Sequence, residues 1–107
     1  MTYRAEEYTY RVFYSEEDNA FVASVAEFPS LSDVEDTQAD ALGSIVALVR
    51  DVLSDMEQEH AAPPEPLGRR RYSGKISLRM TPQQHRRIAM EAAEQGVSIN
   101  QLLVSRV

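Results

Sequence analysis

The residues best suited to do chemistry are polar side chains that alternate with apolar ones in the C-terminal half of the chain. Lys75, Ser77 and Arg79 occupy every second position, and the positions between them are apolar. Side chains of a β-strand alternate between its faces, so this pattern predicts a strand over residues 75–80 with one polar face. Lys and Arg on such a strand can donate hydrogen bonds to guanine O6 and N7 in the major groove of DNA. Contact with DNA bases is therefore predicted for these three side chains.

Two helices are predicted after this strand. Thr81 and Pro82 are typical of the start of a helix, and Gly96 is typical of its end. Ser98 is expected to cap a second helix, whose first N–H groups are free to bind a phosphate. The residues expected to contact phosphate are Arg71, Ser98, Ile99 and Asn100.

This C-terminal segment contains only one predicted strand, and a lone strand leaves its N–H and C=O groups without partners. Roughly 35 residues also bury too little apolar surface to fold alone. The simplest remedy is a second copy, with the two strands pairing antiparallel about a twofold axis. The core of this dimer is expected to consist of Ile76, Leu78, Met80, Ile88, Leu102 and Leu103.

The N-terminal half is predicted to hold strands followed by one helix. Residues 8–14 and 21–25 are rich in β-formers and flank a polar turn, and residues 31–35 are expected to add a third short strand. Thr37 is expected to cap a helix whose apolar residues recur at helical spacing. That stripe contains Leu42, Ile45, Val46, Val49, Val52, Leu53 and Met56. The predicted fold class is α+β, with a small antiparallel sheet and one packed helix.

A proline-rich stretch divides the chain into two modules of opposite charge. Residues 1–60 are predicted to form the first domain, residues 61–71 a Pro/Arg-rich linker, and residues 72–107 the second domain. Residues 1–66 hold 3 Arg/Lys and 15 Asp/Glu, whereas residues 67–107 hold 8 Arg/Lys and 2 Asp/Glu. A cationic partner is therefore expected for the first module and a polyanion for the second.

Several functional classes are disfavoured by composition. The chain has no Cys and only two His, which argues against disulfides, thiolate zinc sites and cysteine nucleophiles. It has neither an apolar run of membrane-spanning length nor a signal peptide, so a cytoplasmic protein with no membrane partner is expected. We expect no catalytic residue, metal, cofactor or small-molecule substrate.

The C-terminal half resembles a ribbon-helix-helix domain, and it is very similar to the C-terminal half of HicB-type antitoxins. The similarity is carried by Ser73-Gly74-Lys75, Arg79-Met80-Thr81-Pro82, His85-Arg86 and the run from Glu91 to Leu102. The first half resembles the family's degenerate RNase H-like module in its strand pair, residues 28–31 and residues 36–42. Glu35 departs from the family pattern, which usually has Gly there.

The resemblance implies a function. A HicB-type antitoxin binds a HicA-type toxin, a small RNA-cleaving protein, and represses its own operon by binding operator DNA as a homodimer or a tetramer.

Two alternatives come from other classes. One is a stand-alone ribbon-helix-helix regulator whose first module senses another ligand or protein. The other is a metal-dependent nuclease, for which the candidate carboxylates are Asp18, Glu27, Asp33, Asp36 and Asp40. Turn and capping roles explain most of these acids, so no enzyme activity is expected.

Overall fold

The computed structural model describes residues 3–107 and divides the chain into two compact units. The first unit spans Met1–Tyr72 and the second spans Ser73–Val107. No helix in residues 3–107 is both long and apolar enough to cross a membrane. The two units are described separately below.

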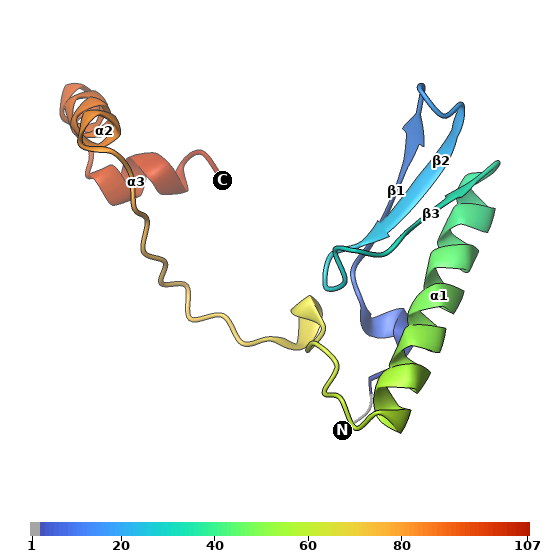
Figure 1. The fold of residues 1–107 in the computed structure, drawn as a ribbon. Helices are drawn as coiled ribbons and strands as arrows, with labels where there is room; N and C mark the ends of the chain where they lie inside the picture. The colour runs from blue at the N-terminus through green and yellow to red at the C-terminus, as the bar shows by residue number, and fades with distance from the viewer. Residues whose placement is uncertain (1–2) are drawn as a thin grey trace. The chain divides into compact units, whose positions relative to one another are not determined.

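The first unit contains a three-stranded antiparallel sheet in the order β1-β2-β3 (Figure 1). Its strands are β1 (Tyr10–Ser15), β2 (Ala20–Val25) and β3 (Ser32–Glu35). Asn19 closes the β1–β2 turn with a φ of 49°, a left-handed conformation that Asn tolerates, and its Oδ1 accepts a hydrogen bond of 2.7 Å from the Tyr14 hydroxyl. The predicted hairpin and short third strand are confirmed.

Helix α1 (Gln38–Gln58) packs across one face of this sheet (Figure 1). The predicted N-cap is confirmed, because the Thr37 side chain accepts a hydrogen bond of 3.1 Å from the Asp40 N–H. The buried stripe differs from the predicted one at the first turn, where Ala41 is buried and Leu42 is 44% exposed. The core consists of Ala5, Tyr8, Ala23, Val25, Ala41, Ile45, Val49 and Leu53. The sheet and helix confirm the predicted α+β class.

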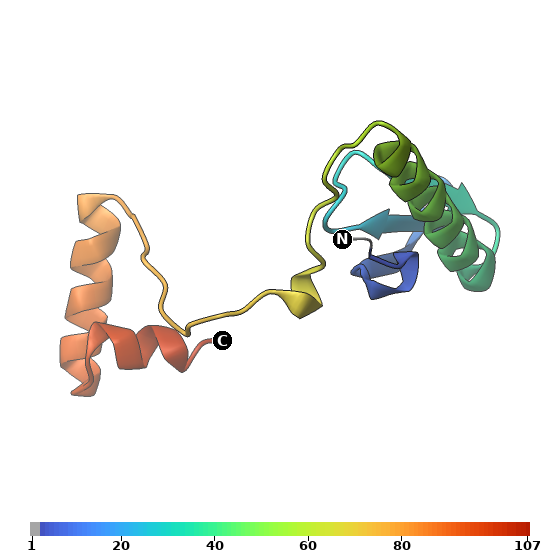
Figure 2. The ribbon, with the colours of Figure 1, turned by 90° about the horizontal axis from the view of Figure 1, so that it is seen from below.

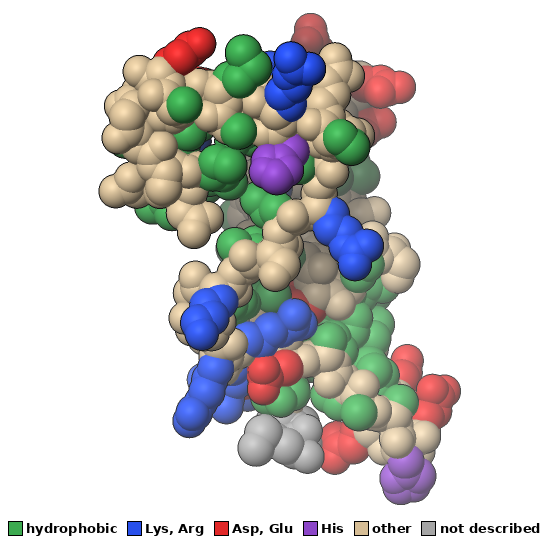
Figure 3. Space-filling view, turned by 90° about the vertical axis from the view of Figure 1, so that its left-hand side faces the viewer, with side chains coloured by type: hydrophobic (Ala, Val, Ile, Leu, Met, Phe, Trp, Pro, Cys, Tyr) green, Lys and Arg blue, Asp and Glu red, His purple; other side chains and the backbone are tan. Residues whose placement is uncertain are grey.

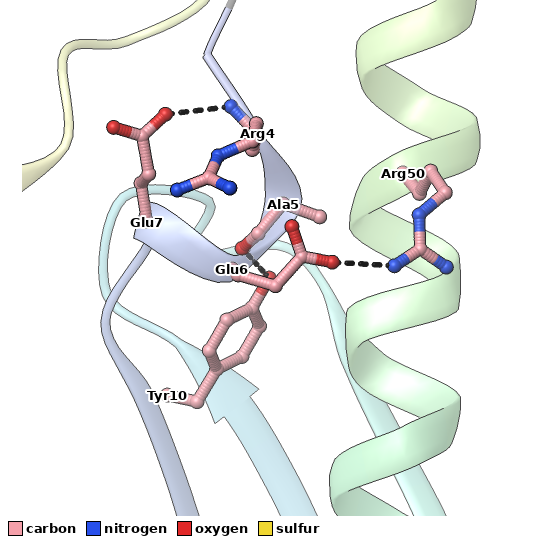
Figure 4. A network of polar contacts seen from close by, with 6 residues as sticks. All are labelled: Arg4, Ala5, Glu6, Glu7, Tyr10 and Arg50. Carbon is pink, nitrogen blue, oxygen red and sulfur yellow. Dashed lines mark hydrogen bonds and ion pairs between the residues drawn. The ribbon is translucent and has the colours of Figure 1, made fainter.

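A short 3-10 helix, η1 (Ala5–Glu7), closes one side of this core (Figure 4). The Tyr10 hydroxyl donates a hydrogen bond of 2.6 Å to the Ala5 carbonyl, and Arg50 of α1 forms an ion pair of 2.6 Å with Glu6. Burial raises the pKa of Tyr10 to about 12, which favours the neutral hydroxyl that makes this hydrogen bond. These contacts join the chain's start to β1 and α1.

Residues 61–71, predicted as a Pro/Arg-rich linker, make several contacts with the first unit. The side chain of Pro66 is fully buried, and the Tyr8 hydroxyl donates a hydrogen bond of 2.9 Å to the Pro64 carbonyl. Glu27 accepts hydrogen bonds from the N–H groups of Leu67 and Thr9. We call residues 63–72 the strap. It packs on the first unit because prolines present a rigid apolar surface with no N–H to desolvate.

The second unit contains α2 (Pro82–Gln95) and α3 (Ile99–Val104), which run in clearly different directions (Figure 2). Both predicted starts are confirmed, because Thr81 and Ser98 each form a reciprocal capping box with the Gln three residues later. Gly96 ends α2 in the left-handed conformation, with a φ of 69°.

Residues 75–80, predicted as a strand, form no strand in the single chain. They run as an extended segment from the strap to α2 (Figure 1). A β-ladder needs a neighbouring strand, and this unit offers none within the described chain. The segment therefore has the unpaired backbone that was expected of a lone strand.

Candidate nucleic-acid interface

The three residues predicted to contact DNA bases lie on the extended segment and are exposed. Lys75, Ser77 and Arg79 are exposed to solvent, and the one hydrogen bond of residues 75–79 runs from the Lys75 N–H to the Ser73 Oγ, at 3.1 Å. Their side chains are thus free to meet a ligand, and neither an ion pair nor a side-chain hydrogen bond engages them within residues 3–107.

The apolar side chains between them are also open to solvent. Ile76 is 83% exposed and Leu78 is 59% exposed, which is unusual for large aliphatic residues next to each other. Of the other residues expected in a dimer core, Leu102 is buried, and Met80, Ile88 and Leu103 are half-buried. The predicted core residues are therefore buried or half-buried except for Ile76 and Leu78, which are exposed.

A groove open to solvent lies between the extended segment and α2. It is lined by Leu78, Arg79, Met80, Gln84, Arg87, Ile88, Glu91 and Arg106. Its walls combine apolar side chains with basic ones, and Arg106 forms an ion pair with Glu91. The space-filling view shows hydrophobic side chains of this unit standing exposed beside Lys and Arg side chains (Figure 3).

The residues predicted to contact phosphate have different surroundings. The Ser98 hydroxyl is occupied, because it accepts the Gln101 N–H at 3.0 Å in the capping box. Asn100 is exposed and Ile99 is half-buried, and both contribute N–H groups of the first helical turn, which have no acceptor within the helix. Arg71 is exposed.

The neighbouring arginines differ in availability. Arg69 forms an ion pair with Glu7, and Arg70 donates two hydrogen bonds to the Glu65 carbonyl. Arg86 and Arg87 are not among the predicted site residues, although both are exposed on α2 and line a second open groove with Thr81. In the sequence they are two basic residues in a row within a predicted helix, but helical periodicity alone does not show that both stay exposed.

The acidic residues of the first unit are spread over its surface. Among residues 3–107, the acids paired with a cation in this unit are Glu6 and Glu7. Within the same residues no group of three or more acids or histidines is placed to hold a metal ion. The five carboxylates considered for a nuclease are therefore not brought together at one point.

Glu27, one of these five acids, connects distant parts of the first unit. Desolvation alone would raise the pKa of Glu27, but hydrogen bonds from the N–H groups of Leu67 and Thr9 outweigh it and hold the pKa below its usual value. The Glu27 carboxylate is thus ionised at neutral pH and fixes the strap to the strand layer.

Comparison with known proteins gives a family for the C-terminal half. Residues 56–107 match the model of the HicB family, and this match supports a HicB-type protein. The matched region runs from the end of α1 through the strap and the whole second unit. It fits an antitoxin of a toxin–antitoxin system and suggests a HicA-type toxin as partner. Neither the curated proteins nor the solved structures gave a match.

Proposed function

We propose that this chain neutralises a cationic HicA-type toxin through its first unit and represses its own operon through a dimeric second unit. The observation that supports the second role is the extended segment of residues 75–80. Its polar positions are free, its apolar positions Ile76 and Leu78 are exposed, and its backbone has no ladder partner in the single chain. Pairing with a second copy would bury Ile76 and Leu78, give the backbone a ladder partner and leave the polar positions free to meet DNA.

Antiparallel pairing of two such segments forms a two-stranded ribbon. Its apolar face packs on α2 and α3 of both copies, and its other face presents Lys75, Ser77 and Arg79 twice. A ribbon of this width fits the major groove, where Arg and Lys donate to guanine. The exposed Arg86 and Arg87 add positive charge for phosphates on either side.

The charge of the first unit supports the toxin-binding role. No Lys or Arg occurs between Arg11 and Arg50, whereas Asp and Glu are frequent there. A toxin that acts on RNA carries a cationic surface, and an acidic antitoxin accelerates and orients its binding. In this proposal the chain acts by covering its partner and performs no catalytic step of its own.

Co-expression with the toxin encoded beside this chain tests both roles. We expect the full chain to restore growth that the toxin arrests and to co-purify with it. We also expect it to retard DNA from upstream of its own reading frame in a gel-shift assay. Growth arrest that persists at equal expression would refute toxin neutralisation. DNA retardation without any toxin binding would instead favour a stand-alone regulator.

A further inference from the structure

The sheet of the first unit has one face that α1 does not cover. Strand register places Phe13 of β1 opposite Val22 of β2, and Val22 opposite Val34 of β3. The neighbouring row of Val12, Ala23 and Asp33 points to the other face, where Ala23 is fully buried against α1. We call Phe13, Val22 and Val34 the apolar row.

The apolar row crosses all three strands and is open to solvent. Phe13 is 39% exposed and Val34 is 47% exposed, and Val22 is half-buried between them. The guanidinium of Arg11 lies 5.0 Å from the centre of the Phe13 ring and covers one end of the row. An aligned row of three apolar side chains on a solvent-facing sheet has no role in this unit's own core.

The loops next to the apolar row are acidic. Glu16, Glu17 and Asp18 follow β1 directly, and Asp36 follows β3. None of these four carboxylates forms an ion pair within residues 3–107. Because two copies meeting here would bring like charges together, self-association is disfavoured. The acidic edge is complementary to a cationic protein surface.

We propose that the apolar row is the surface on which the cationic toxin docks, which rests on the function proposed above. An apolar centre bordered by charge is the usual anatomy of a specific protein interface. Phe13 and Val34 supply apolar surface that is buried on binding, and the acidic loops are complementary in charge to lysines and arginines of the partner. The outer side of α1 is also acidic, but Leu42 is the one large apolar residue of this helix that is exposed.

Two matched pairs of variants of the full chain test this surface. Val34→Lys and Ala47→Lys each replace an exposed apolar residue by lysine, but Ala47 lies on α1, on the other side of the sheet. Asp36→Lys and Asp51→Lys make the same comparison for charge reversal, because Asp51 is an exposed residue of α1. The probe is a catalytically inactive variant of the toxin encoded beside this chain, titrated by calorimetry at 0.15 M salt.

We expect Val34→Lys and Asp36→Lys each to weaken toxin binding by about tenfold or more, as for a change at an interface centre. Ala47→Lys and Asp51→Lys should stay within about twofold, because both residues lie on α1, on the opposite side of the sheet from the apolar row. Phe13→Ala, which adds no charge, should also weaken binding. Unchanged thermal unfolding of each variant excludes misfolding as the cause.

The outcomes separate this inference from the proposed function. If the wild-type chain binds the toxin and the sheet variants bind equally well, the docking surface is refuted while toxin binding stands. If the wild-type chain does not bind, both fail. If Val34→Lys instead changes the oligomeric state of the free chain, the apolar row is a contact between copies, and the inference is wrong.

Discussion

Leu78→Asp tests whether the extended segment pairs with a second copy. Leu78 is 59% exposed in the single chain, so pairing would remove more than half of its surface from water. Full burial of a leucine is worth about 1.5–3 kcal/mol, which gives about 1–2 kcal/mol for this side chain in each copy. The substitution loses that gain and places an unpaired carboxylate in an apolar layer, which costs several kcal/mol more or forces the carboxylate to take up a proton.

The variant is therefore expected to weaken the dimer by about 5 kcal/mol or more, counting both copies. Since about 1.4 kcal/mol corresponds to a factor of ten, its dissociation constant should rise by at least about 1000-fold. Sedimentation equilibrium at micromolar concentration measures this change directly. Ser77→Asp is the matched control, because it adds the same charge one residue earlier on the opposite face and should abolish operator binding while the dimer remains. A Leu78→Asp chain that dimerises like the wild type would refute the pairing.

The remaining predictions concern the DNA contact and the strap. Arg79→Ala should weaken specific operator binding by about 1–3 kcal/mol in fluorescence anisotropy at fixed salt, as for a lost bidentate contact to guanine, and unchanged affinity would mean that another surface meets the DNA. Glu27→Gln should lower the free energy of unfolding of the first unit by about 1.5–3 kcal/mol at pH 7, because it loses charge-assisted hydrogen bonds from the Leu67 and Thr9 N–H groups. The pKa of Glu27 is lowered in the folded chain, so this stabilisation is fully present above the usual carboxyl pKa and is lost as the pH falls through the lowered one. In urea denaturation, the free energies of unfolding of wild type and variant should thus differ at pH 7 and converge at the most acidic pH that keeps the chain folded. An equal loss of stability in the control Glu65→Gln, at an exposed residue, would contradict this role.

Local sequence signals predicted the helix starts of both units and the hairpin of the first unit. The cap at Thr37, the capping boxes at Thr81 and Ser98 and the stop at Gly96 depend on a few adjacent residues, and the structure confirms each of them. The hairpin was equally accessible, because β-forming residues on both sides of a polar turn define it.

Features that depend on distant residues were not predicted. Leu42 has the right spacing for the buried stripe, but it lies in the first turn of α1, and the position that reaches the sheet there is Ala41. The periodicity of a helix fixes the direction of its apolar face only to within about one residue. In the same way, the Leu67 N–H donates to Glu27, which is 40 residues away in the sequence, and no local signal predicts that contact.

The candidate interface was predicted as a set of residues rather than as a surface. Alternation of polar and apolar residues identified Lys75, Ser77 and Arg79, and all three are exposed as that pattern requires. The apolar row was missed for a related reason, because Phe13, Val22 and Val34 come together only through the register of three strands. Register is set by pairing between segments and cannot be read from one segment alone.

The docked strap changes where this chain can be cut or extended. A fragment ending at residue 60 would lose the buried Pro66 ring and the acceptor of the Tyr8 hydroxyl, and would leave Glu27 without one of its amide donors. The tolerant position for a tag, an insertion or a truncation is instead Ser73–Gly74, an exposed pair at the boundary between the two units. Prolines that resemble a spacer are, in this molecule, the last piece of a folded domain.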